Sequence, residues 1–257
     1  MPVEFDPGPP AAIAEHFAKL PSYAAWKDYF WLDWGPVFYR GRLDGSQRVL
    51  CVASDPGPTE RIAGRTLVGD AGQRAQGFLR KIGLTRSYLC LNAHMIALFP
   101  GEGSKGLEIL DNATQKTWRN KLYDMARPPG LEAIIAFGEQ AQKAVSLWPG
   151  KGSVPVINVQ HPSARKEAPL LAGWKAAVTQ LRTIVTPDAD GSLNAQNYGA
   201  TFKKSDFSAI PRRDLPFGAP DFLGDDAWLR AKTPPENTSV NRPSGDRHTL
   251  IWKAPKS

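Results

Sequence analysis

The chain has 257 residues, 42% of them hydrophobic, and a net charge of +7, which suit one well-buried core and favour a polyanionic partner. Its two cysteines, Cys51 and Cys90, lie in apolar runs and form no C-x-x-C pair, so we expect neither a metal site nor a disulfide. No apolar stretch approaches the roughly 20 residues of a membrane span and no signal segment is recognisable, so we expect a soluble, cytoplasmic protein without a membrane partner.

The predicted elements alternate between helices and strands. Residues 10–33 carry apolar side chains at helical intervals, including Ile13, Phe17 and Phe30, and predict a helical packing layer. Four apolar runs predict strands at 48–54, 88–92, 131–137 and 154–160, and further helices are predicted at 71–83, 115–126, 139–148 and 170–185. This alternation implies right-handed crossovers and a parallel sheet covered on both faces. We therefore expect an α/β fold: a three-layer α/β/α sandwich with a central, mainly parallel four-stranded sheet.

The composition divides the chain into three parts. Residues 1–46 form an N-terminal helical layer of the same domain, residues 47–187 the α/β core, and residues 188–257 a C-terminal extension that is rich in Pro, Gly, Asn and Asp. The extension has apolar residues that suggest packing on the core rather than a free linker: Phe202, Phe207, Phe217, Phe222, Trp228 and residues 250–252.

Three segments place chemically active side chains directly after predicted strands: 53–72, 89–95 and 161–166. They carry Asp55, Asn92 and His161 respectively. Because the carboxyl ends of parallel strands meet at one edge of an open α/β sheet, where such sheets bind ligands, we expect these three side chains to converge. Singly, each has an ordinary structural explanation, since Asp before Pro is typical of turns and a loop histidine is often merely hydrogen-bonded. The ordered set of acid, amide and imidazole favours a functional site.

Together the motifs resemble those of the uracil-DNA glycosylase superfamily, over about residues 47–185. The D-P at 55–56 is similar to that of the classical family's G-Q-D-P-Y-H, and the G-P at 57–58 is similar to the G-M-N-P-G-P of the single-strand-selective branch. Residues 64–72 are similar to the G-R-P-F-V-G-x-A-G of the iron-sulfur branch, and the H-P-S at 161–163 occurs in most branches. The chain resembles a divergent member that mixes features of these families.

The resemblance implies roles at the base and sugar. Breaking the N-glycosidic bond leaves positive charge on the deoxyribose and negative charge on the departing uracil. Asp55 would orient or deprotonate the attacking water, and a neutral His161 would donate a hydrogen bond to uracil O2. Asn92 would accept from N3–H and donate to O4, a pattern that cytosine presents reversed. Ser54 replaces the polar neighbour of the family's usual glycine and belongs with the substrate-binding residues.

The loop after His161 would contact DNA. The target base lies inside a duplex stack, so the nucleotide must be flipped out at a cost of a few kcal/mol. Arg165 falls where the classical family places an intercalating leucine, and with Lys166 it would fill the vacated stack and contact phosphate. Ser163 is a candidate phosphate hydrogen-bonder.

Two further substrate-binding positions depart from the family. Gly57 replaces the tyrosine that excludes the methyl group of thymine, and Leu67 replaces the phenylalanine that stacks on uracil, a contact of about 1–3 kcal/mol. The four cysteines of the iron-sulfur branch are missing, so we expect no cluster, no other metal and no cofactor.

We therefore expect a monomeric, monofunctional uracil-DNA glycosylase of DNA repair, whose partner is uracil-containing DNA, single-stranded or in a mismatched duplex. Two alternatives stay open. The first is a non-catalytic or slow-turnover protein that binds uracil or abasic DNA. The second, weaker alternative is a nucleotide-binding domain that uses the Gly-rich residues 64–72, which lack the Lys-Ser/Thr of a P-loop.

Overall fold

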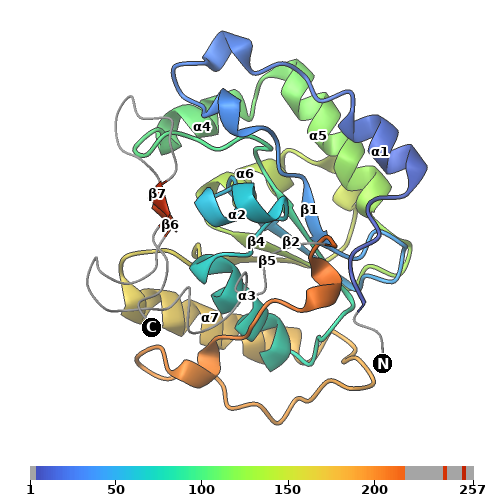
Figure 1. Cartoon of the computed structure of the whole chain (residues 1–257). Coiled ribbons are helices and arrows are strands. Elements are labelled where there is room, and N and C mark those ends of the chain that lie inside the picture. The colour runs from blue at the N-terminus through green and yellow to red at the C-terminus, as the bar shows by residue number, and fades with distance from the viewer. Residues whose placement is uncertain (1–3, 218–239, 242–250, 253–257) are drawn as a thin grey trace.

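The computed structural model describes residues 4–217, 240–241 and 251–252, and its centre is a five-stranded sheet (Figure 1). The strands are β1 (Tyr39–Gly41), β2 (Val49–Ala53), β3 (Tyr88–Asn92), β4 (Ala133–Phe137) and β5 (Val156–Val159), in the order β1-β3-β2-β4-β5. All neighbours are parallel except β1 and β3. The prediction of an α/β fold with a mainly parallel sheet is confirmed. The predicted strand number of four is wrong, because the short antiparallel strand β1 adds a fifth strand at the edge.

One face of the sheet is covered by α3 (Asp70–Lys81) and α7 (Glu167–Leu181). Alternate residues of each strand point to this face, among them Cys51 of β2. Phe78 of α3 and Trp174 of α7 are fully buried and meet edge to face, with ring centroids 5.2 Å apart. Burying a large apolar side chain contributes about 1.5–3 kcal/mol, so these rings are a main source of cohesion for this layer.

The opposite face is covered by α1 (Ala11–Phe17), α5 (Ala113–Ala126) and α6 (Glu139–Ser146). The residues of β2 that point this way, Leu50 and Val52, are as inaccessible as those on the first face. Figure 1 shows α3 and α7 below the sheet and α1 and α5 above it. A central strand buried on both faces explains why the sequence of β2 is apolar throughout rather than alternating.

The predicted helix over residues 10–33 is wrong beyond its first two turns. Helix α1 ends at Phe17, and the chain continues through the 3-10 turns η1 (Ala24–Trp26) and η2 (Leu32–Trp34). Pro21 has no N–H to continue a helical ladder and restricts the residue before it, so the helix stops ahead of it. Phe30 is buried nonetheless, in a small cluster of its own.

Two helices were not predicted. Helix α2 (Pro58–Ala63) begins with proline inside the 53–72 segment, and α4 (Gly103–Ile109) is rich in glycine. A further 3-10 turn, η3 (Pro149–Lys151), precedes β5. None of the helices in the part of the chain that the structure describes is long and apolar enough to cross a membrane.

Residues 188–217, which we call the C-terminal strap, run over the surface of the core. Asp188 accepts hydrogen bonds from the backbone N–H groups of Thr85, Arg86 and Ser87, ahead of β3. Further along, the strap forms the 3-10 turns η4 (Lys204–Asp206) and η5 (Arg212–Asp214). The strap is therefore part of the packed structure.

The apolar residues expected to anchor the extension differ in their environment. Phe207 is buried, Phe202 is half-buried, and Phe217 is 85% exposed and is not a core anchor. The predictions for Phe222 and Trp228 lie outside the described residues. Beyond the strap, β6 (Val240–Asn241) and β7 (Ile251–Trp252) pair with each other antiparallel.

A buried charge network joins the strap to the sheet edge. The Arg40 side chain of β1, completely inaccessible, donates to Asp214 Oδ2 at 2.9 Å and to Gln76 Oε1 at 2.8 Å. Tyr88 Oη donates to the same Asp214 oxygen at 2.6 Å, and Arg42 donates to Oδ1 at 2.9 Å. Burial, with Asp214 as a further cause, raises the pKa of the Tyr88 hydroxyl well above its ordinary value. The phenol therefore stays protonated and serves as a donor.

Candidate functional site

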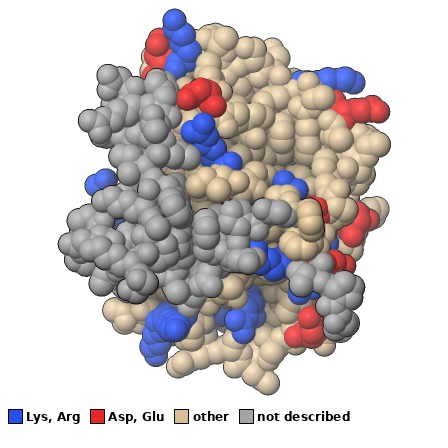
Figure 2. All heavy atoms as spheres, in the orientation of Figure 1, with Lys and Arg blue, Asp and Glu red and all other residues tan. Residues whose placement is uncertain are grey.

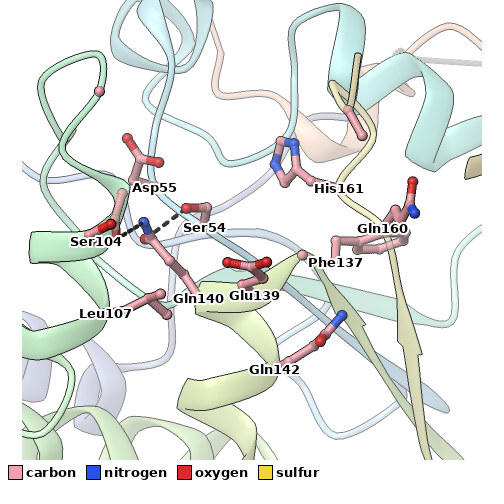
Figure 3. Close-up of a pocket in the computed structure, with 14 residues that line it drawn as sticks. Ser54, Asp55, Ser104, Leu107, Phe137, Glu139, Gln140, Gln142, Gln160 and His161 are labelled. Carbon is pink, nitrogen blue, oxygen red and sulfur yellow. Dashed lines mark hydrogen bonds between the residues drawn. The ribbon is translucent and has the colours of Figure 1, made fainter. Parts of the chain in front are cut away.

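A cleft of about 780 Å³ opens at the carboxyl ends of β2, β4 and β5, where an open α/β sheet is expected to bind ligands (Figure 3). Its walls come from the loop after β2, the start of α4, the junction between β4 and α6, and the loop after β5. The lining residues are Ser54, Asp55, Gly101, Gly103, Ser104, Leu107, Phe137, Gly138, Glu139, Gln140, Gln142, Gln160, His161 and Ala164.

Two of the predicted residues lie directly after β2. Asp55 is partly exposed to the cleft, and its Oδ2 accepts a hydrogen bond from the backbone N–H of Leu98 at 2.9 Å. Ser54 Oγ donates to Oε1 of Gln140 at 2.8 Å, which links the loop after β2 to α6. Both contacts hold the loop against its neighbours, so the Asp55 carboxylate is fixed at the cleft rather than carried on a free turn.

His161 follows β5 and lines the same cleft. The backbone N–H of Ser163 donates to its Nδ1 at 3.2 Å, and Ser163 Oγ lies 3.1 Å from the same atom. Because a backbone N–H can only donate, Nδ1 is the acceptor, and a neutral ring must carry its proton on Nε2. Figure 3 shows the ring extending from its backbone towards the side of the cleft on which Asp55 lies.

Gly138, at the end of β4, makes room for this ring. It has φ of +85°, and a Cβ at this position would lie 2.9 Å from Cβ of His161. A side chain here would be strained and would push the histidine away. Gly138 follows the predicted strand 131–137 and precedes α6. The close approach of His161 explains why this position is occupied by glycine.

The remaining three substrate-binding predictions do not line the cleft. Gly57 lies just beyond it at the start of α2. Leu67 is 5% exposed and packs in the same apolar cluster as Ala53. Asn92 pairs with Ala53 across the sheet and is 1% exposed, and neither its Oδ1 nor its Nδ2 has a hydrogen-bond partner among the described residues. A buried amide without partners costs about 1–3 kcal/mol and is unusual in a native fold.

Leu67 has the only left-handed backbone conformation of any non-glycine residue that the structure describes, with φ of +52°. Its carbonyl oxygen would lie 1.8 Å from a Cβ at Gly72, so only glycine lets α3 approach this closely. Strained backbone of this kind costs on the order of 1–3 kcal/mol and clusters at functional sites. Leu67 does not line the open cleft.

Glu60 is a positioning residue that the sequence analysis did not single out. Its Oε1 accepts from the backbone N–H groups of Val68 and Gly69, both at 2.8 Å, and its Oε2 accepts from Gly57 N–H at 3.0 Å. The buried carboxylate thus ties the turn after Asp55 to the turn that carries Leu67. Proline at the first position of α2 followed by Glu at the third is a recognisable helix start, so the sequence did contain a signal for it.

The predicted DNA-contacting residues lie on one exposed loop between β5 and α7. Ser163, Arg165 and Lys166 are all exposed. Pro162 O accepts from Arg74 Nη1 at 2.9 Å, and Gln160 O accepts from Trp174 Nε1 at 3.0 Å, so helices α3 and α7 both hold the loop.

Two other polar residues lie at or behind the cleft and were not among the predicted site residues. Glu139 at the start of α6 is exposed and lines the cleft beside Gln140. His94 lies behind the loop after β2, where its Nε2 is 3.1 Å from Gly106 O. Burial lowers the pKa of His94 to about 4, so this ring is neutral near pH 7 and does not supply charge.

Within the residues described, no group of three or more His, Cys, Asp or Glu side chains is arranged to hold a metal ion. A comparison with models of protein families and with curated proteins finds no match.

Proposed function

We propose that this protein is a DNA repair glycosylase that hydrolyses the N-glycosidic bond of uracil flipped out of DNA and leaves an abasic site. The observation that carries the proposal is a carboxylate, Asp55, and an imidazole, His161, on one cleft at the carboxyl ends of parallel strands. Helices on both faces of the sheet fit the three-layer α/β/α arrangement of the uracil-DNA glycosylase superfamily. In this proposal the enzyme acts as a monomer in the cytoplasm and needs no cofactor.

The two side chains suit the two charges that develop as the bond breaks. A carboxylate beneath the sugar stabilises an oxocarbenium-like deoxyribose and orients the water that attacks C1′. His161 offers Nε2–H because Ser163 N–H occupies Nδ1. A neutral donor at the pyrimidine O2 stabilises the departing anion without transferring a full proton. The water's proton passes to Asp55 and the bond electrons to the uracil ring.

Base selection in this proposal falls to Asn92. Its amide is buried, and neither of its polar atoms has a hydrogen-bond partner among the described residues. Both atoms are therefore able to form hydrogen bonds with a bound base. Uracil N3–H and O4 would satisfy both atoms, whereas cytosine would present a donor where Asn92 donates. Leu67 belongs to the same apolar cluster as Ala53, which pairs with Asn92 across the sheet, and the proposal therefore includes a shift of the Leu67 turn when the base enters.

The test is single-turnover excision from a uracil-containing oligonucleotide in EDTA buffer, read as alkali-labile sites. Asp55→Asn should lower the rate about 10²–10⁴-fold and His161→Ala about 10²–10³-fold, the usual contributions of a general base and of one anion-stabilising donor. Asn retains a side-chain oxygen for Leu98 N–H, so the substitution at Asp55 leaves the loop contact intact.

Asp28→Asn is the matched control, because this aspartate is exposed and does not line the cleft. It should have the wild-type rate. Full activity of both Asp55→Asn and His161→Ala would refute the assigned roles, and an inactive wild-type enzyme on single-stranded and U:G substrates would refute the glycosylase proposal itself.

A specific observation favours a second candidate, a protein that binds uracil or abasic DNA with little turnover. The amide of Asn92 and the side chain of Leu67 are outside the open cleft that contains Asp55 and His161. If the Leu67 turn shifts rarely, chemistry would be slow while DNA binding persisted. Gel-shift affinity for abasic DNA without multiple turnover would favour this candidate.

A further inference from the structure

The middle of the C-terminal strap is fixed against α3 and the start of α7. Phe202 N–H donates to Glu167 Oε1 at 2.6 Å, and Ser208 N–H donates to Gln73 O at 3.1 Å. Between them the strap backbone approaches α3 so closely that a Cβ at Gly77 would lie 1.9 Å from Asp206 O. Residues 202–208 are thus held at both ends and in the middle.

Arg74 of α3 joins this part of the strap to the loop after His161. Its Nη1 donates to Pro162 O at 2.9 Å, and its guanidinium lies 4.5 Å from the ring centroid of Phe202 and 5.4 Å from that of Phe207. One side chain therefore contacts two segments that are some forty residues apart in sequence. The loop with Arg165 and Lys166 and the strap with Lys203 and Lys204 are neighbours on the surface as a result.

The four basic side chains of these two segments are exposed and outnumber the exposed carboxylates beside them, Glu167 and Asp70. Asp206 pairs with Lys81 Nζ at 2.8 Å and accepts from the Lys203 N–H. Asp70 pairs with Arg74 at 3.2 Å. Figure 2 shows Lys and Arg side chains over the lower part of one face, where Figure 1 places α3 and η4. The outward charge of this region is therefore positive.

We propose that Lys203 and Lys204 extend the DNA-binding surface from the loop after His161 onto the C-terminal strap, where they bind the phosphodiester backbone of the strand beside the flipped nucleotide. The inference rests on the proposed function for the identity of the strand. Exposed lysines on a fixed backbone supply charge to phosphate without reading sequence. The strap then binds DNA in addition to packing on the core. No motif of the core suggested this binding role.

The experiment measures binding of the full chain to a fluorescein-labelled single-stranded oligonucleotide without uracil, at a series of salt concentrations. Each phosphate contact on single-stranded DNA contributes about 0.7 to the slope of log affinity against log salt. The variant K203Q/K204Q should lower this slope by about 1.4 relative to wild type. The control K19Q/K121Q removes two exposed lysines from the opposite side of the sheet, near α1 and on α5, and should retain the wild-type slope.

A second measurement needs no variant. Acetylation of lysines in the wild-type protein, followed by mass spectrometry, should show Lys203 and Lys204 protected by the oligonucleotide while Lys19 and Lys121 react equally with and without it. An unchanged slope in K203Q/K204Q together with unprotected strap lysines would overturn the inference. If the wild-type protein binds DNA through the strap but excises no uracil, the surface stands and the glycosylase proposal fails.

Discussion

Glu60→Gln tests the claim that one buried carboxylate joins the two turns beside the cleft. The wild-type carboxylate accepts three backbone hydrogen bonds, at 2.8, 2.8 and 3.0 Å. In the variant the amide oxygen can keep the two contacts with Val68 and Gly69, but the –NH₂ group faces the N–H of Gly57 and cannot accept from it. The other two bonds lose their charge assistance.

The magnitude follows from these three contacts. A hydrogen bond to a charged group contributes about 1.5–3 kcal/mol and a neutral one about 1 kcal/mol, so one lost bond and two weakened bonds should lower the free energy of unfolding by at least about 2.5 kcal/mol. Urea denaturation followed by tryptophan fluorescence measures this difference. Glu108→Gln is the control, because the Glu108 carboxylate is exposed and pairs with Lys105 at the surface, so its loss should change stability by less than about 0.5 kcal/mol. A loss below about 1 kcal/mol in Glu60→Gln would refute the reasoning.

The remaining predictions concern packing and pH. Gly72→Ala should destabilise the fold by about 1–3 kcal/mol, since its Cβ would lie 1.8 Å from the carbonyl oxygen of Leu67. Gly173→Ala is the opposite case: a Cβ at this position of α7 meets open space, so the variant should be more stable by up to about 1 kcal/mol. Thermal denaturation measures both differences. Burial alone would raise the pKa of Asp188, but hydrogen bonds from Ser87 and the backbone lower it to about 2. The contribution of the ionised carboxylate to stability is therefore complete above about pH 4 and is lost as the pH falls through 2. In acid titrations, the stability of Asp188→Asn should not show this loss. Burial lowers the pKa of His94 to about 4, below its unfolded value near 6.5, so wild-type stability should decrease by roughly 3 kcal/mol as the pH falls from 6.5 to 4, and His94→Gln should flatten this slope in denaturant titrations at several pH values.

The parallel strands could be predicted from the sequence because β2 and β4 are apolar throughout, as burial on both faces requires, and β3 and β5 are apolar apart from Asn92 and Asn158. Strand β1 could not. It has three residues, and its central Arg40 resembles a surface residue until Asp214, which lies 174 residues later in the sequence, is seen to neutralise it. A short strand stabilised by a distant charge leaves no local pattern to detect.

The candidate site, like the sheet, has residues whose positions could be predicted from the sequence and others whose positions could not. Convergence of Asp55 and His161 on one cleft could be anticipated, because both follow parallel strands and the ends of such strands share an edge. The burial of Asn92 could not be anticipated, since a polar residue at the end of a strand carries no local signal of how the loops pack around it. Arg74 also had no signal, because its partners lie on a loop and a strap that meet only in three dimensions.

The dependence of Arg40 on Asp214 has a consequence for biosynthesis. When the ribosome has released the chain as far as Pro187, every strand of the central sheet is available, yet the counter-charge for the inaccessible guanidinium is still to come. An unpaired buried charge is strongly unfavourable, so the edge of the sheet cannot close stably at that stage. Nascent chains that terminate before Asp214 would keep this edge open and be exposed to proteases, so only molecules synthesised through Asp214 could close it.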